Sequence, residues 1–222
     1  MKVIARYWLA AAGLAVTIST ARAQHPMTGV EQARMDSIRR PYTKADIAFM
    51  SGMISHHAQA VKMASWAPTH GASKSLQIYC GRVAMAQTAE IGLMQQWLRE
   101  RNQPVPDADP KGMKMAMAGM ENMADMPGMS VYKRMPGMLT DAQMAQLDSA
   151  RGVEFDRLFL KYMIQHHQGA LEMVDTLNNT PGAAQDEIVF KFSNDVHADQ
   201  STEIDRMQQM LDALPPPRTK KP

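Results

Sequence analysis

The stretch FMSGMISHHAQAVKM, residues 49–63, places two adjacent histidines among methionines, and nearly the same phrase recurs as FLKYMIQHHQGALEM, residues 159–173. A second block repeats in the same order, since QTAEIGLMQQWL at 87–98 matches QSTEIDRMQQML at 200–211. Two matched blocks at an offset of about 110 residues indicate an internal duplication.

Each unit of the duplication predicts a helical hairpin. Threonine caps, at Thr43 and at Thr140 before a short extra helix, and Gly and Pro breaks set the expected helix ends. Because each hairpin must bury an apolar face, the sequence predicts an all-α fold, an antiparallel four-helix bundle built from two duplicated hairpins. The main helices are expected over about 44–67, 73–101, 154–177 and 185–214, with a short one over 30–39.

The beginning of the chain predicts export. Lys2 and Arg6 precede the apolar run WLAAAGLAVTI, and residues 21–23 have the small-x-small pattern of a signal-peptidase site. The run is too short to span a bilayer comfortably, although a membrane anchor is the alternative. We therefore expect a periplasmic or secreted protein. The expected segments are a signal peptide (1–23), a short N-terminal segment (24–40), the first hairpin (41–101), a Met-rich flexible connector (102–139), the second hairpin (140–214) and a Pro/Lys tail (215–222).

Helical geometry places the histidines of each motif on the buried side. At about 100° per residue, Met53, His56, His57 and Met63 share one apolar arc, while Lys62 lies opposite. The second motif repeats this arrangement. Burying an imidazole costs free energy unless its nitrogens find partners. Two interpretations therefore stay open: metal ligands, or structural pairs that hydrogen-bond within the bundle.

The second helix of each hairpin carries a matching stripe of polar residues and methionine, spaced i, i+3, i+7. Gln or Glu on this stripe could accept the N–H of a histidine whose other nitrogen binds metal. The alternative is that these side chains sit in water at the edge of the bundle. Cys80, whose counterpart is Ser193, is interpreted as a small buried side chain. The stripe residues are Gln87, Glu90, Met94, Gln200, Glu203 and Met207.

Methionine is unusually frequent, at 22 of 222 residues against one cysteine, and it concentrates between the hairpins. Residues 111–138 contain Gly and Pro but no Leu, Ile or Phe, so a core helix is not expected there. Thioethers on a flexible backbone suit a soft monovalent ion, Cu(I), or Ag(I) in vitro. A compositional linker or an oxidant trap is the alternative. The candidate ligands are Met113, Met115, Met117, Met120, Met123, Met126, Met129, Met135 and Met138.

Other metals fit the pattern less well. Calcium and magnesium prefer oxygen ligands, and zinc gains little from methionine. A di-iron bundle would carry Glu-x-x-His on two helices, but Met53 and Met163 stand three residues before His56 and His166.

The two His-His motifs and the two EI-x-x-M helices resemble the domain-of-unknown-function 305 family, over roughly residues 40–214. The resemblance implies a ferritin-like four-helix fold, and some exported members of the family are described as periplasmic copper-binding metallochaperones. It implies a ligand role for His56, His57, His166 and His167, with Met53, Met63, Met163 and Met173 beside them.

The sequence therefore predicts a binding protein that sequesters or carries Cu(I), rather than an enzyme. Its expected partners are the copper ion and a periplasmic protein that exports or accepts copper. No nucleic-acid partner is expected, because 24 Lys and Arg nearly balance 22 Asp and Glu, and no membrane partner is expected for the mature form. The alternatives are a ferritin-like redox enzyme of the cuprous oxidase type and a structural bundle with incidental methionine.

Overall fold

The computed structural model describes residues 28–30, 41–110 and 135–216. Within these ranges the chain is all-α, with no strand. The expected signal peptide, most of the short helix expected over 30–39 and most of the Met-rich connector lie outside the described residues. The described helices are α2 (Lys44–Ser65), α3 (Lys74–Glu100), α5 (Asp141–Ser149), α6 (Val153–Asn178) and α7 (Glu187–Asp212).

The helices begin where side chains can satisfy the free backbone N–H groups of the first turn. Thr43 and Asp46 form a reciprocal capping box at the start of α2. Thr140 and Gln143 form another at the start of α5. The predicted boundaries of the four long helices lie within about two residues of those observed, as is usual for helix ends.

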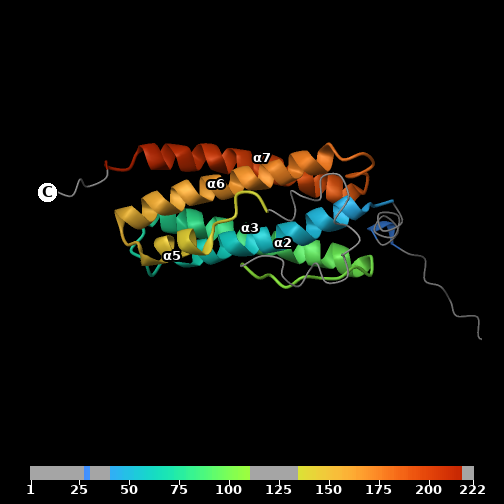
Figure 1. The fold of residues 1–222 in the computed structure, drawn as a ribbon, viewed down its shortest axis with the longest axis horizontal. Coiled ribbons are helices and arrows are strands. Elements are labelled where there is room, and N and C mark those ends of the chain that lie inside the picture. The colour runs from blue at the N-terminus through green and yellow to red at the C-terminus, as the bar shows by residue number, and fades with distance from the viewer. Residues whose placement is uncertain (1–27, 31–40, 111–134, 217–222) are drawn as a thin grey trace, which may run out of the picture.

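The four long helices form two antiparallel hairpins, α2 with α3 and α6 with α7 (Figure 1). Contacts are most extensive within each hairpin, and α2 and α6 join the two hairpins along their length. The short helix α5 packs against α6 at one end of the bundle (Figure 1). The predicted all-α fold of two hairpins is confirmed.

Equivalent aspartates tie the hairpins together at opposite ends. Asp46 of α2 accepts a hydrogen bond from the backbone N–H of Ala184, which precedes α7, at 2.7 Å. Its counterpart Asp156 of α6 accepts from the backbone N–H of Ser73, the N-cap of α3, at 3.2 Å. Each buried carboxylate therefore reaches from one hairpin to the start of the second helix of the other.

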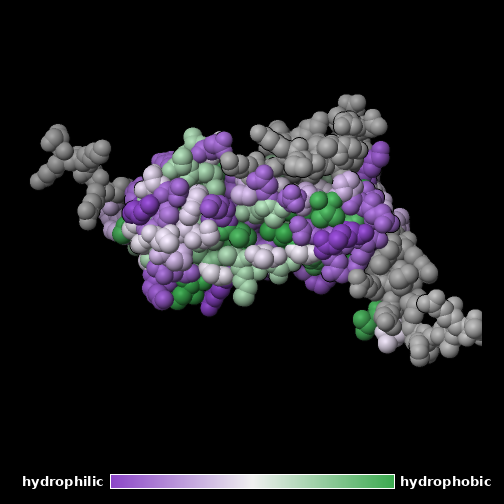
Figure 2. All heavy atoms as spheres, turned by 90° about the horizontal axis from the view of Figure 1, so that it is seen from below, coloured by the Kyte–Doolittle hydropathy of each residue, from purple (hydrophilic) through white to green (hydrophobic). Residues whose placement is uncertain are grey.

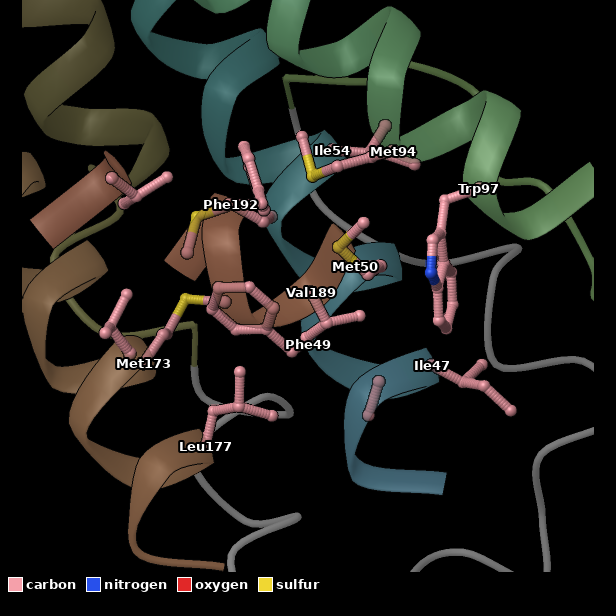
Figure 3. Close-up of a cluster of buried hydrophobic side chains, with 14 of the residues drawn as sticks. Ile47, Phe49, Met50, Ile54, Met94, Trp97, Met173, Leu177, Val189 and Phe192 are labelled. Atoms are coloured by element: carbon pink, nitrogen blue, oxygen red, sulfur yellow. The ribbon is translucent and has the colours of Figure 1, made fainter. Parts of the chain in front are cut away.

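The core consists of two clusters of buried side chains, one toward each end of the bundle. The first core cluster contains residues of α2 up to Ala58 and residues of α6 from Ala170 onward. Figure 3 shows its centre, where Phe49 and Phe192 lie among methionine side chains. The second core cluster contains residues of α2 from Ala60 onward and of α6 up to Met163. Because α2 and α6 run in opposite directions, both His-His motifs fall at the junction between the clusters.

Polar side chains predominate on one face of the molecule. In Figure 2, polar residues cover most of the face shown, with apolar residues in small patches between them. Across residues 28–30, 41–110 and 135–216, no helix is both long and apolar enough to cross a membrane.

Candidate metal centre

Four histidines occupy the junction between the two core clusters. His56, His57, His166 and His167 are all fully buried, at 0% exposure. The predicted orientation of the motifs is therefore confirmed, and Lys62, expected on the opposite side of α2, is exposed.

The histidines divide into an inner and an outer pair. The inner pair, His56 and His166, bridges α2 and α6, with ring centroids 3.8 Å apart and ring planes at 42°. The outer pair, His57 and His167, lies farther out, with ring centroids 6.5 Å and 6.2 Å from those of their sequence neighbours. Residues 110 positions apart in the sequence thus come into direct contact.

The outer pair is held by glutamates from the partner helices. The Nε2 atom of His57 lies 2.6 Å from Oε2 of Glu90 on α3. The Nε2 atom of His167 lies 2.6 Å from Oε2 of Glu203 on α7. A carboxylate only accepts, so each Nε2 donates; when the ring is neutral, Nδ1 carries the lone pair. Each glutamate side chain is 24–27% exposed and so joins a buried ring to solvent.

The rest of the predicted stripe is buried but makes no such contact. Gln87 and Gln200 are each 3% exposed, and no hydrogen-bond partner for their Oε1 atoms lies within the described ranges. Met94 and Met207 are fully buried, one in each core cluster. Of the two residue types expected to accept from histidine, only glutamate does so. Whether these residues support a bound metal stays a prediction.

The inner pair is asymmetric. Nε2 of His56 donates to the backbone carbonyl of Pro136, at 3.0 Å. In the part of the chain that the structure describes, neither ring nitrogen of His166 has a hydrogen-bond partner. The backbone of His56 lies near the His166 ring without meeting hydrogen-bond geometry.

Burial keeps the inner pair neutral. Burial first, and then the neighbouring His57, lowers the pKa of His56 from its ordinary 6.5 to about 3. Burial, followed by the nearby imidazoles with His56 foremost, lowers the pKa of His166 well below its ordinary value. Both rings therefore present lone pairs at neutral pH, which is the form that binds metal.

Five buried ring nitrogens have no hydrogen-bond partner among the described residues, and we call them the open nitrogens. An unsatisfied buried polar group costs about 1–3 kcal/mol, so five of them together need a reason. Imidazole nitrogens are ligands that copper accepts, and the residues present therefore fit this ion. The open nitrogens are Nδ1 of His56, His57, His166 and His167, and Nε2 of His166.

The methionines of the two motifs flank the histidines on both sides. Met53 and Met173 lie in the first core cluster, and Met63 and Met163 lie in the second. All four are fully buried. Thioether sulfur is thus available toward either end of the bundle.

Oxygen, thiol and imidazole ligands by themselves do not form a closed site. Within 41–110 and 135–216, no group of three or more His, Cys, Asp or Glu side chains is gathered closely enough to hold a metal ion. Cys80 is buried, and burial followed by Asp156 raises its pKa to about 12, so its thiol stays protonated. Its interpretation as a small buried side chain is confirmed.

Most of the connector methionines lie outside the described residues, from Met113 to Met129. Met135 is 7% exposed and Met138 is half-buried. Residues 135–139, which the sequence assigned to the flexible connector, pack against α2 and α6. The backbone N–H of Leu139 donates to Oε1 of Gln59 at 2.7 Å.

Sequence reasoning missed the residues that make this contact: Gln59 and Gly169 on the helices, and Pro136 and Gly137 in the segment itself. One signal could have found two of them, because Gln59 and Gly169 occupy the same position in the two repeats and differ in type. His70 is a structural residue, since its Nε2 donates to the carbonyl oxygen of Asp148 at 2.8 Å.

Several solved structures share the fold of this chain. A DUF305 protein from Streptomyces coelicolor, described as secreted, is 24% identical, with a TM-score of 0.59 over 76% of this chain and 92% of its own. A DUF305 fragment from Deinococcus radiodurans is also 24% identical, with a TM-score of 0.59 over 78% and 99%. At this identity the likeness concerns the fold alone.

A third structure is CopM in the Cu(II)-bound form, 28% identical, with a TM-score of 0.54 over 75% of this chain and 95% of its own. CopM is also solved in a Cu(I)-bound form, 25% identical with a TM-score of 0.54 over 78% and 97%. No protein with a curated description matches the chain in sequence. Residues 46–211 match the family described as Domain of unknown function (DUF305), and the chain belongs to that family.

Proposed function

We propose that this protein is exported and binds copper, and that it sequesters or carries Cu(I) through histidine and methionine ligands. The observation that carries the proposal is the set of five open nitrogens on four fully buried imidazoles. A bundle selected only for packing would place leucine at these positions, because buried polar groups without partners destabilise the fold. Four such histidines are explained by a ligand that takes up their lone pairs.

The available ligand atoms favour a soft ion. The inner pair stays neutral and thioethers need no deprotonation, so among the described residues the carboxylates in contact with the histidines are those of Glu90 and Glu203. Neutral nitrogen and sulfur ligands suit Cu(I), and Ag(I) in vitro, better than Ca²⁺ or Mg²⁺. The inner pair would bind the ion, with thioethers from the flanking clusters completing its coordination. Glu90 and Glu203 would then orient the outer pair from behind.

The relatives support the same ion. CopM, 25–28% identical over about three quarters of this chain, has been solved with Cu(II), Cu(I) and silver bound. Imidazole and thioether ligands together can bind all three of these ions, since imidazole also suits Cu(II).

The connector would add capacity next to this site. Oε1 of Gln59 accepts from the backbone of Leu139, and Nε2 of Gln59 donates to the carbonyl of Pro110, at 3.2 Å. The chain therefore leaves and returns to the bundle at one side chain, three positions after His56. Methionines of the segment 111–138 would capture the ion at this point and pass it to the buried histidines. The signal-peptide pattern at 1–23 supports a periplasmic or secreted location, where a copper-exporting or copper-accepting protein would be the partner.

Competition titration tests the proposal. The mature chain, from Gln24 onward, is titrated with Cu(I) against a chromophoric chelator, in parallel with a variant in which all four histidines are leucine. We expect the variant to lose the tightest site and to keep the weaker binding of the connector. Equal affinity of the two proteins for the first equivalent would overturn the proposal. Multiple-turnover oxidation of Cu(I) by the wild-type protein would point to an enzyme instead.

A further inference from the structure

The two His-His motifs are equivalent in sequence but not in the structure. Nε2 of His56 donates to the carbonyl of Pro136, whereas its counterpart His166 has no hydrogen-bond partner among the described residues. The difference lies in one segment, residues 135–139, whose Pro136 carbonyl accepts from His56 and not from His166. What holds this segment therefore decides how the site departs from two-fold symmetry.

The turn at Pro136 and Gly137 lies directly on α6. Gly137 has φ of +78°, a left-handed conformation that glycine adopts freely. A Cβ on Gly137 would lie 2.6 Å from the carbonyl oxygen of Gln165. Nε2 of Gln165 donates to the carbonyl of Gly137 at 3.2 Å. A Cβ on Gly169 would overlap the Pro136 carbonyl, so this close approach needs glycine on the helix as well.

Gln59 fixes the other side of the segment. Its Oε1 accepts from the N–H of Leu139 at 2.7 Å, and its Nε2 donates to the carbonyl of Leu139 at 3.1 Å and to that of Pro110 at 3.2 Å. The side chain is 2% exposed, so these bonds are shielded from competing water. Two buried hydrogen bonds to Leu139 hold the segment in place, and the third ties the same side chain to Pro110.

One position of the repeat carries a different residue in each copy, and the two residues support the same segment in different ways. Gln59 and Gly169 are equivalent in the repeat. Gln59 supplies the hydrogen bonds on α2, and Gly169 supplies the space on α6. Both act on the segment that carries the Pro136 carbonyl. The same carbonyl accepts from His56, which lies one helical turn before Gln59.

We propose that Gln59 is a positioning residue: by holding residues 135–139 against α2 and α6, it fixes His56 as the Nε2–H tautomer and presents the Nδ1 lone pair to the metal. A carbonyl oxygen can only accept, so a neutral His56 bonded to Pro136 must carry its proton on Nε2. Among the described residues no hydrogen bond of this kind fixes the tautomer of His166. The centre therefore combines one ligand whose tautomer is preset with one for which the described residues preset none. The tautomer part rests on the metal-free geometry, and the metal part rests on the proposed function.

The tautomer is measured directly on the metal-free protein, by long-range ¹H–¹⁵N NMR correlation of the imidazole nitrogens. In the wild type we expect His56 to be a single Nε2–H tautomer. Gln59→Leu keeps the side-chain volume, removes the three hydrogen bonds and introduces no metal ligand. We expect a mixture of tautomers at His56 in this variant. The matched control Gln168→Leu makes the same change at an exposed position of α6, and it should leave His56 unchanged.

A second variant disturbs the hydrogen bond between His56 and Pro136 through a different residue. Gly169→Ala leaves Gln59 intact but must displace the Pro136 carbonyl, so it should give the same tautomer mixture. Circular dichroism establishes that each variant retains its helices. A single Nε2–H tautomer at His56 in both folded variants would overturn the proposal.

Copper affinity provides the second readout. Residues that orient a metal ligand typically change affinity by about 10-fold to 100-fold when they are replaced, and we expect Gln59→Leu to weaken Cu(I) binding within that range. Unchanged affinity despite a mixed tautomer would overturn the metal part of the proposal. Absence of Cu(I) binding in the wild type would overturn the proposed function while leaving the tautomer result intact.

Discussion

The imidazole rings of His56 and His166, equivalent residues of two repeats, lie with their centroids 3.8 Å apart at the centre of the bundle. Two neutral, buried rings at this distance give up hydration, and only one of their four nitrogens has a hydrogen-bond partner among the described residues. Such an arrangement costs folding free energy. A ligand that takes the remaining lone pairs recovers it.

Replacing His166 by leucine should therefore stabilise the metal-free protein. Removing unsatisfied buried nitrogens is expected to raise the free energy of unfolding by about 1–3 kcal/mol, while Cu(I) binding is lost or weakened. Urea denaturation of the apo form measures the first effect, and chelator competition measures the second. His197→Leu, at an exposed position of α7, should change neither. Marked destabilisation by His166→Leu would instead indicate a structural role for this ring.

Acid should destabilise the metal-free protein before carboxylates begin to titrate. The pKa of His56 is about 3 in the folded protein against 6.5 ordinarily. Between these two values the unfolded chain binds a proton at this residue and the folded chain does not. Stability is then lost as pH falls from about 6.5 toward 3, by at most about 1.4 kcal/mol per pH unit for each such histidine. Denaturation at pH 7 and pH 5 measures the loss. A variant with both His56 and His166 changed to leucine should lose less, and an equal loss in the two proteins would contradict the assignment.

Neutralising either glutamate behind the outer pair should weaken copper binding. Glu90→Gln and Glu203→Gln each remove a carboxylate that accepts from a histidine Nε2, and replacing such groups typically costs about 10-fold to 100-fold in affinity. Equal effects are expected if both motifs serve one site, because the two contacts have the same length of 2.6 Å. Asp205→Asn, at an exposed position of α7, is the control. Full affinity in both glutamine variants would remove these residues from the site.

Removing the connector should separate two classes of copper site. Replacing residues 111–134 with a Gly-Ser linker is expected to lower the number of Cu(I) ions bound while leaving the His56 contact with Pro136 intact. Extending the replacement to residue 138 also removes Pro136, so the tightest site should weaken as well. Stoichiometry and affinity are read from the same titration. Identical behaviour of the two deletions would show that residues 135–138 do not contribute to the buried site.

Cys80 should be inert in the folded protein. Burial followed by Asp156 raises its pKa to about 12, and the thiolate is the reactive form. Reaction with a thiol reagent at pH 7.5 should therefore be far slower in native than in denatured protein. Cys80→Ser should leave Cu(I) affinity unchanged, since the second repeat already carries Ser193 at this position. Fast modification of the native protein would show that the thiol is accessible.

Local patterns in the sequence were enough to predict the helices and the direction of the histidines. Helical periodicity relates residues three and four positions apart, so the burial of His56 and His57 and the exposure of Lys62 follow from their spacing. The capping box of Thr43 and Asp46 is equally local. The repeat added the pairing of the hairpins, because two similar amphipathic hairpins bury their faces against each other.

Contacts between distant residues could not be predicted in the same way. The sequence offered Gln and Glu equally as partners of the outer pair, and only the relative rotation of α2 and α3 selects Glu90 over Gln87. The link from Asp46 to Ala184 spans 138 positions and depends on how the hairpins are offset.

The sequence by itself determined that this protein is a duplicated helical bundle with histidines and methionines facing its seam, because periodicity and repetition are properties of the chain. Only the tertiary structure decided that the two motifs are unequal. The Pro136 carbonyl reaches His56 across 80 positions of sequence. Gln59 holds it there, and Gly169, which has no side chain, leaves room for it. Such a contact is set by the packing of three segments at once, which no local pattern encodes.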